Sequence, residues 1–327
     1  MAVAPGGLLR GLSRTLNELR RLRPLAWPQT DRVYLGDLPV REPRRYAVVT
    51  TITDNFIGMG AAFLLSLHER LGRRDEVDVI LLQSPGVAPL SLEHGIALEA
   101  LCPGLKIVDV DTSSFLTPEN MTRYDKEGRP VSRRRDRYEL PSKKAAFVKL
   151  NVLRLAQYEK VVLMDSDMLV VDDFSDVFDL NHDLAAVRTG APDPDFTPEH
   201  RGRGADRTGF NTGFVAFDQS AIGVGAFNTA LDFMELRRNR RLRDQSILNE
   251  IFGRADRLYL PHAYNYKIHS SDPDPLSRAE TLERVKVLHF VATTKWGLKD
   301  PANRGKAIYD YYHAVQKRTG IPFILEP

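Results

Sequence analysis

Apolar residues follow two different spacings along most of the chain, and these spacings predict an alternation of strands and helices. Runs rich in β-branched residues predict buried strands, and apolar residues spaced three or four apart predict the helices between them. The predicted strands cover 45–53, 77–82, 105–110 and 160–164, and the predicted helices cover 58–70, 95–101 and 145–156. This alternation is typical of an α/β fold with a mostly parallel central sheet, in which ligands bind beyond the carboxyl ends of the strands.

The first 45 residues have a different pattern from the rest. Six leucines between positions 8 and 22 recur mostly three or four residues apart, with arginines between them, which predicts an amphipathic helix that ends at Pro24. We therefore divide the chain into an N-terminal basic helix and linker, 1–45, and one larger domain, 46–327. Three interpretations of the helix stay open: docking on the protein's own surface, pairing in a homodimer, or peripheral membrane contact through residues 8–23.

The composition excludes several classes of protein. The chain has 327 residues, of which 43% are hydrophobic, so it can form a large core and is not intrinsically disordered. Its 46 basic residues nearly balance its 43 acidic residues, which gives no reason to expect a nucleic-acid partner. The single cysteine excludes an internal disulfide and a zinc site of several thiolates. No apolar run approaches the ~18 residues of a transmembrane helix, and arginines replace the apolar part of a secretory signal, so we expect a cytoplasmic protein.

Two carboxylates follow the predicted strand 160–164 directly. Asp165 and Asp167 are separated by one residue, and a second apolar run, 168–171, comes next. Three other Asp-x-Asp sequences occur in the chain, but only this one lies between two apolar runs. Carboxylates at the edge of a sheet can share one divalent cation, Mn²⁺ or Mg²⁺, and the cation can bridge two phosphates of a nucleotide diphosphate. The alternative is a solvated turn between two strands.

Three further groups of polar residues can complete such a site. A histidine lies within the apolar run 285–291, and a lysine six residues later can reach a phosphate. An Asn-x-Gly sequence opens the predicted strand 215–217, where an amide can bind sugar hydroxyls, and an Asp-Gln pair lies near the start of a predicted helix, 246–252. Each group also has a simpler interpretation. The histidine can be a buried core residue, the Asn-x-Gly sequence can be a turn, and the aspartate of the Asp-Gln pair can cap the helix. The residues concerned are His289, Lys295, Asn211, Gly213, Asp244 and Gln245.

The order of these motifs resembles that of the glycogenin-like family of retaining glycosyltransferases, glycosyltransferase family 8. The resemblance covers about residues 46–300 and implies a GT-A fold, a nucleotide-sugar donor (a UDP-sugar in most members) and usually manganese. Its motifs are, in order, Phe147-Val-Lys149-Leu150, Asp165-Ser-Asp167, Asn211-Thr-Gly213, Asp244-Gln245, Leu260-Pro-His-Ala-Tyr-Asn265 and His289 to Lys295-Trp296. The chain departs from the family where Ala292 replaces a usual glycine and where no proline separates Lys295 from Trp296.

By position, the resemblance implies a role for each candidate residue. The implied metal ligands are Asp165, Asp167 and His289. The residues beside the uridine are Thr51, Ile52, Thr53 and Asp54, with Ile57 where many members have an aromatic residue that stacks on the base, and Ser166 lies beside the ribose. The donor sugar is surrounded by Lys149, Asn211, Gly213, Asp244 and Gln245, and Lys295 holds the diphosphate.

These expectations combine in one predicted function, that of a metal-dependent retaining hexosyltransferase. Asp244 or Gln245 is expected beneath the anomeric carbon, while the leaving phosphate assists attack on the same face. Three arginine-rich clusters, 133–137, 201–207 and 237–243, are compatible with a small-molecule or lipid-linked acceptor that carries phosphate or carboxylate, although a solvated basic surface is a slightly better explanation of them.

Two other functions are alternatives to the transferase. One is a catalytically silent nucleotide-sugar-binding protein on the same scaffold. The other is a sugar nucleotidyltransferase, whose triphosphate needs a Gly-rich loop with a basic residue after the first strand. Residues 51–60 contain neither lysine nor arginine, which disfavours this second alternative.

Overall fold

The computed structural model describes most of the domain predicted at 46–327. The described residues are Trp27, 36–87, 89–113, 116, 146–189, 199–201, 209–236, 243–268, 284–291 and 306–322. The predicted helix at 8–23, Lys295 and the arginine cluster 133–137 lie outside these residues, as do most of the clusters 201–207 and 237–243.

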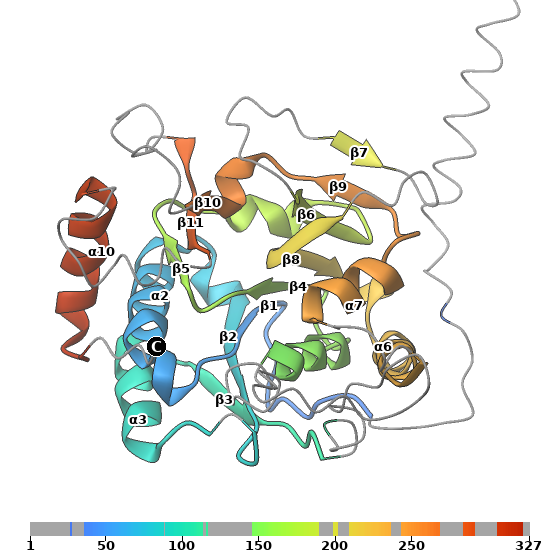
Figure 1. Cartoon of the computed structure of the whole chain (residues 1–327), viewed down its shortest axis with the longest axis horizontal. Helices are drawn as coiled ribbons and strands as arrows, with labels where there is room; N and C mark the ends of the chain where they lie inside the picture. Colours follow the sequence, from blue (N-terminus) through green and yellow to red (C-terminus); the bar gives the residue numbers. More distant parts are fainter. Residues whose placement is uncertain are drawn as a thin grey trace, which may run out of the picture.

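Eight strands form the central sheet of the molecule (Figure 1). They are β1 (Tyr46–Thr50), β2 (Val77–Gln83), β3 (Lys106–Asp109), β4 (Lys160–Met164), β6 (Leu184–Arg188), β7 (Glu199–Arg201), β8 (Phe210–Asp218) and β9 (Arg257–Tyr259). Their order is β3-β2-β1-β4-β8-β6-β9-β7. The pairs β3–β2, β2–β1, β1–β4 and β6–β9 are parallel, whereas β8 is antiparallel to both its neighbours and β7 is antiparallel to β9. The predicted α/β fold with a mostly parallel sheet is confirmed.

A second, three-stranded sheet stands beside the first. Its strands are β5 (Met168–Val170), β10 (Tyr266–Ile268) and β11 (Val287–Phe290), in the order β10-β11-β5. β11 is parallel to β10 and antiparallel to β5. Only residues 165–167 separate β4 from β5, so the chain leaves one sheet and enters the other within this turn. The two apolar runs on either side of the aspartates are both strands, as predicted, but they belong to different sheets.

Helices cover both faces of the central sheet (Figure 1). They are α2 (Ile57–Arg70), α3 (Leu92–Leu101), α6 (Val224–Leu236), α7 (Asp244–Ile251) and α10 (Lys306–Thr319). Side chains alternate across a strand, so Ala47 and Val49 of β1 pack in the core with α6 and α7, whereas Val48 packs in the core with α2 and α3. α10 closes a third apolar cluster against α2 and β11. Among the described residues, no helix combines the length and apolarity needed to cross a bilayer.

Two predicted helices differ in detail from the structure. The helix predicted at 95–101 begins earlier, at Leu92, because the Ser91 hydroxyl accepts a hydrogen bond from His94 N at 3.3 Å and caps it. The helix predicted at 145–156 is an α-helical turn at 146–148 followed by a 3₁₀-helix, η3 (Lys149–Arg154). In η3 the Asn151 side chain donates to Val148 O at 3.0 Å, a local bond of the kind that competes with regular α-helix. The other 3₁₀-helices are η1 (Asp54–Phe56), η2 (Arg74–Glu76), η4 (Ser175–Asp179), η5 (Gln219–Ala221) and η6 (His262–Asn265).

Two of the described residues before β1, Trp27 and Leu38, pack against the domain. Leu38 is buried, and its backbone N donates to Arg154 O in η3 at 2.9 Å. Trp27 packs edge-on against Phe252, with ring centroids 5.2 Å apart. The division of the chain at residue 45 stays a prediction.

A buried carboxylate ties the first strands of the sheet together at their amino ends. Asp78, in β2, is 2% exposed. Its Oδ2 accepts hydrogen bonds from Arg44 N at 2.9 Å, Lys106 Nζ at 2.8 Å and the Tyr158 hydroxyl at 2.7 Å. Burial and the hydrogen bond to Asp78 raise the pKa of Tyr158, so its hydroxyl stays a donor at neutral pH. Three donors thus replace the water that the carboxylate loses on burial.

We predict that Asp78→Ala lowers the free energy of unfolding by about 3 kcal/mol, because it leaves the Tyr158 hydroxyl and Arg44 N without their acceptor and removes the carboxylate beside Lys106. Urea unfolding followed by circular dichroism measures the change. Asp75→Ala, which removes an exposed carboxylate three residues earlier, is the matched control. It is expected to change the same quantity by less than about 0.5 kcal/mol. Equal stability of the two variants would contradict the role given to Asp78.

Candidate active site

The two candidate aspartates occupy the turn that joins β4 to β5. Asp165 N donates to Gly213 O of β8 at 2.9 Å, and Phe290 N of β11 donates to Asp167 O at 2.9 Å. The turn is therefore held by the central sheet on one side and by the three-stranded sheet on the other. Asp167 is buried and Asp165 is partly buried. Both carboxylates thus lie just beyond the carboxyl end of β4.

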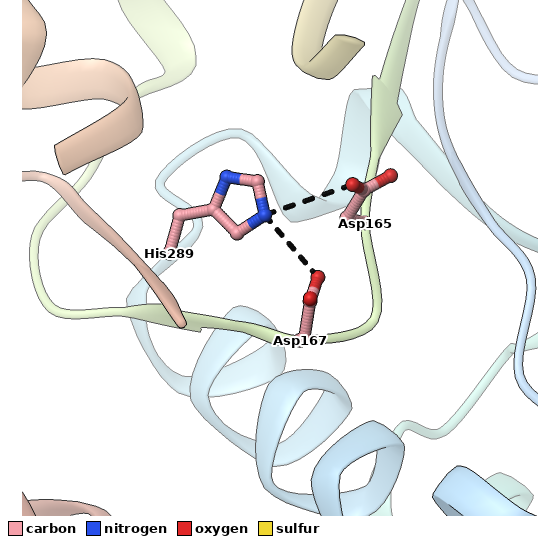
Figure 2. Close-up of side chains that lie close together, drawn as sticks. All are labelled: Asp165, Asp167 and His289. Carbon is pink, nitrogen blue, oxygen red and sulfur yellow. Dashed lines mark ion pairs between the residues drawn. The ribbon is translucent and has the colours of Figure 1, made fainter. Parts of the chain in front are cut away.

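The pairing of β11 with β5 places His289 beside both carboxylates (Figure 2). His289 lies opposite Met168 in the antiparallel register and is 3% exposed. Its Nε2 is 3.4 Å from Asp167 Oδ1 and 3.7 Å from Asp165 Oδ2. One possible ligand atom from each of the three residues lies within 4.8 Å of the other two. The structure therefore brings together the three residues that the resemblance names as metal ligands.

The chemistry of these three residues fits a divalent cation. Carboxylate oxygens suit Mg²⁺ and Mn²⁺, and an added imidazole nitrogen favours the transition metal. His289 Nδ1 is hydrogen-bonded to Asn265 Oδ1 at 2.8 Å, which is the usual arrangement for a metal-binding histidine. This bond leaves Nε2, on the side of the two carboxylates, as the nitrogen that can bind an ion. The donor set therefore fits the expected manganese.

Lys149 lies between Asp165 and Asp244. Its Nζ is 2.5 Å from Asp165 Oδ1 and 3.7 Å from Asp244 Oδ2. Burial alone lowers the pKa of Lys149, but the negative charges of the two aspartates outweigh burial and raise it above the usual value. Burial raises the pKa of Asp244, and the charge of Lys149 opposes that rise. Lys149 is therefore protonated and offsets part of the negative charge of the site.

A cleft of about 870 Å³ opens beside this cluster, a size typical of small-molecule sites. Four of the five residues expected around the donor sugar line it, namely Lys149, Asn211, Asp244 and Gln245, together with Asp165. The cleft continues along α7, where Arg243, Glu250 and Arg254 also line it. The cavity thus extends from Asp165, one residue of the aspartate–histidine cluster, to a surface that carries charged side chains.

Gly213, the fifth of those residues, lies against the His289 ring. A Cβ atom on Gly213 would be 2.4 Å from His289 Cε1 and 2.7 Å from His289 Nδ1. Any other residue at this position would therefore displace the imidazole. The structure supplies a reason for the glycine that differs from the expected contact with the sugar.

Asn265 is a residue of this site that the sequence motifs left without a role. It ends η6, is fully buried, and bonds to His289 Nδ1 through Oδ1. Its Nδ2 donates to Asn211 Oδ1 at 2.7 Å, and Asn211 Nδ2 donates to Gln245 Oε1 at 3.2 Å. The motif 260–265 contributes to the family resemblance, but only these hydrogen bonds reveal which of its side chains reaches the site.

The residues expected beside the uridine lie just after β1. Ile52 and Ile57 are buried in the apolar core with α2, so their side chains offer no surface to a base. This differs from the expectation for Ile57, and the reason is that the first turn of α2 packs this face of the helix against the sheet. Thr51 and Thr53 are largely buried as well, whereas Ser166, in the turn between the aspartates, is partly exposed.

Asp54 is held by hydrogen bonds at the start of α3. Its Oδ1 accepts from Ser91 N at 3.0 Å and lies 2.8 Å from His94 Nδ1. Partial burial raises the pKa of Asp54, but the hydrogen bonds from His94 and Ser91 outweigh it and lower the pKa. Asp54 is thus ionised at neutral pH, and it joins the loop after β1 to α3.

We predict that Gly213→Ala weakens Mn²⁺ binding by about tenfold or more, because the added methyl group displaces the His289 imidazole. Calorimetric titration of the purified protein with Mn²⁺ measures the affinity. Gly86→Ala is the matched control, because a Cβ atom there meets no atom within 4 Å, and its affinity is expected to be unchanged. A folded Gly213→Ala variant with normal affinity would show that the ring position is not critical.

Comparison with known proteins supports this interpretation of the fold. Residues 100–297 match the family model described as glycosyl transferase family 8. No curated protein sequence matches the chain significantly.

Solved glycosyltransferase structures share the fold. The galactosyltransferase LgtC in complex with donor and acceptor sugar analogues is 18% identical, with a TM-score of 0.54 over 84% of this chain and 97% of that one. The apo bifunctional glycosyltransferase WbbM is 18% identical, with a TM-score of 0.53 over 86% of this chain and 52% of that one, so this chain spans about half of it. Apo GlyE of Streptococcus pneumoniae TIGR4 is 18% identical, with a TM-score of 0.51 over 88% of this chain and 65% of that one.

At this level of identity the solved structures support the fold alone. They confirm the predicted GT-A architecture, in which β4 ends at the paired aspartates. The family model, in contrast, spans more than half of the chain, including the aspartates and His289. The chain therefore belongs to glycosyl transferase family 8.

Proposed function

We propose that the protein transfers a hexose from a UDP-sugar to an acceptor with retention of the anomeric configuration, using Mn²⁺ held by Asp165, Asp167 and His289. The observation that carries the proposal is the convergence of these ligand atoms within 4.8 Å of one another, beside the cleft, in a family 8 glycosyltransferase. When bound, the ion stabilises the negative charge that develops on the departing nucleoside diphosphate.

The charges around the site agree with a divalent ion. When Asp165, Asp167 and Asp244 are ionised they carry three negative charges, and Lys149 offsets one of them. The remaining two match the charge of one divalent cation. Because Lys149 contacts both Asp165 and Asp244, it also links the proposed metal site to the proposed sugar site and holds the two carboxylates near each other.

The proposed reaction centre lies at the start of α7. Asp244 and Gln245 both line the cleft, and the Gln245 side chain is held by Asn211. In the proposed reaction the acceptor oxygen forms a bond to the anomeric carbon on the face from which the phosphate leaves, and the acceptor proton passes to the departing phosphate oxygen. The Asp244 carboxylate, on the opposite side, stabilises the positive charge of the sugar as the bond to phosphate breaks, and Gln245 lies beside it beneath the anomeric carbon.

The proposed acceptor carries phosphate or carboxylate. Arg243 and Arg254 line the same cleft as the proposed sugar site, with Glu250 as one acidic side chain near them. A guanidinium group binds both kinds of anion through paired hydrogen bonds, so these arginines favour such an acceptor over a neutral sugar.

The test of the proposed function is a product screen. The wild-type protein is offered UDP-, GDP- and ADP-hexoses with neutral and anionic acceptors, with Mn²⁺ or with EDTA, and products are identified by mass spectrometry. We expect a product only with Mn²⁺ and a UDP-sugar, and an NMR coupling constant that shows the same anomer as in the donor. Full activity in EDTA or an inverted anomer would contradict the proposal. Tight binding of the nucleotide sugar with no turnover would instead indicate the silent binding protein.

We predict that Asp165→Asn, Asp167→Asn and His289→Ala each weaken Mn²⁺ binding by about 100-fold or more, because each removes one ligand of the same ion. Calorimetry with Mn²⁺ in the presence of UDP measures the affinity. Asp109→Asn, which changes an exposed carboxylate in another Asp-x-Asp sequence, is the matched control and is expected to bind Mn²⁺ normally. Normal Mn²⁺ binding by the Asp167→Asn variant would remove the proposed metal site.

A further inference from the structure

A single chain of side-chain hydrogen bonds joins the proposed metal site to the proposed reaction centre. It runs from His289 to Asn265, then to Asn211, and ends at Gln245, with donor–acceptor distances of 2.8, 2.7 and 3.2 Å. His289 lies on β11 and Gln245 lies on α7, so the two ends belong to different elements of the fold. The chain of amides is therefore a direct connection between the two parts of the site.

The polarity of this chain is set by one backbone group. Gly213 N donates to Asn211 Oδ1 at 3.0 Å, and a backbone N–H can only donate. Asn211 must therefore present its oxygen on this side, and Asn265 must present its Nδ2 to the same oxygen. The Asn265 oxygen is then left to face His289, where it can only accept.

The tautomer of His289 follows from this polarity. Because Asn265 Oδ1 accepts, His289 Nδ1 must carry a proton, and in the neutral ring Nε2 then keeps its lone pair. Nε2 is the nitrogen that lies 3.4 Å from Asp167 and 3.7 Å from Asp165. A neutral histidine in the opposite tautomer would present an N–H group to the ion and could not bind it.

The same polarity orients Gln245. Asn211 uses its oxygen for Gly213 and Asn265, so it offers its Nδ2 to Gln245 Oε1. The carbonyl oxygen of Gln245 is thereby turned toward Asn211, and its amide N–H groups are the donors that it can offer to a ligand in the cleft. A flip of either asparagine amide would break bonds at both of its neighbours.

We propose that Asn265 is a positioning residue that sets the tautomer of His289 and, through Asn211, the orientation of the Gln245 amide. The proposal rests on the proposed function for its catalytic meaning, since His289 matters as a ligand and Gln245 as part of the reaction centre. The tautomer itself is a property of the metal-free protein. A buried asparagine that only fills space in the core has no effect on which nitrogen of a neighbouring imidazole is protonated.

The first experiment measures the tautomer without metal or donor. Nitrogen-15 NMR distinguishes a protonated ring nitrogen from one with a free lone pair. The His289 signals are those that disappear in His289→Gln. We expect a protonated Nδ1 in the wild type and a shift toward protonated Nε2 in Asn265→Leu, which is similar in size but has no hydrogen-bonding group. A wild type with protonated Nε2 would overturn the proposal.

The second experiment uses a variant that separates the two ends of the chain. In Asn265→Asp a carboxylate still accepts from His289 Nδ1 but cannot donate to Asn211 Oδ1. We expect this variant to keep the tautomer and the Mn²⁺ affinity while the turnover number falls with little change in the KM for the donor. Asn265→Leu is expected to lose Mn²⁺ affinity by about 10–100-fold. Asn228→Leu, at a buried asparagine of α6, is the matched control and is expected to keep both properties.

The outcomes separate this proposal from the proposed function. If wild-type protein shows the expected tautomer but binds no Mn²⁺, the metal-dependent transferase is wrong and the positioning role of Asn265 stands. If wild-type protein binds Mn²⁺ and folded Asn265→Leu keeps the wild-type tautomer and affinity, the positioning role is wrong and the transferase stands. If Asn265→Leu does not fold, Asn265→Asp decides, because loss of the tautomer in that variant contradicts the proposed bond.

Discussion

The pairing of β5 with β11 is the constraint on which the site depends. The turn from Asp165 to Asp167 ends β4 of the central sheet and starts the edge strand of a second sheet. The register that places His289 opposite Met168 then brings an imidazole from far along the chain against both carboxylates. A slip of one residue would turn His289 to the other face of its sheet. The carboxylates of Asp165 and Asp167 are neighbours in the sequence, whereas the imidazole of His289 reaches them only through the tertiary structure.

The parts of the fold that the sequence predicts are those decided locally. β1 to β4 are apolar runs separated by helical spacing, and parallel order follows from that alternation. The position of Asp165 and Asp167 at the end of β4 is predictable for the same reason. Periodicity does not indicate which distant strands pair, so the antiparallel β8 and the separate sheet of β5 and β11 were not predictable from it.

The candidate site divides in a similar way. Position within a motif identified His289, Lys149 and Gln245, and the structure places all three around the aspartates or the cleft. Position alone did not show that Ile57 is buried beneath the loop expected to hold the base, because burial depends on what packs over a residue. It also could not assign Asn265, since an asparagine in a loop motif looks the same whether it caps a turn or bonds to a buried imidazole.

The hydrogen bonds around Asp78 lie at the amino ends of the strands, whereas the cleft lies at the carboxyl ends. The two clusters share no residue, so the effects of substitutions in one are expected to add to those in the other. A lineage can therefore accumulate stabilising changes at one end of the sheet while the other end drifts toward a new acceptor. Residues that determine stability and residues that line the cleft therefore lie at different ends of the strands. Directed evolution of this scaffold can first stabilise the amino ends and then diversify the residues that line the cleft.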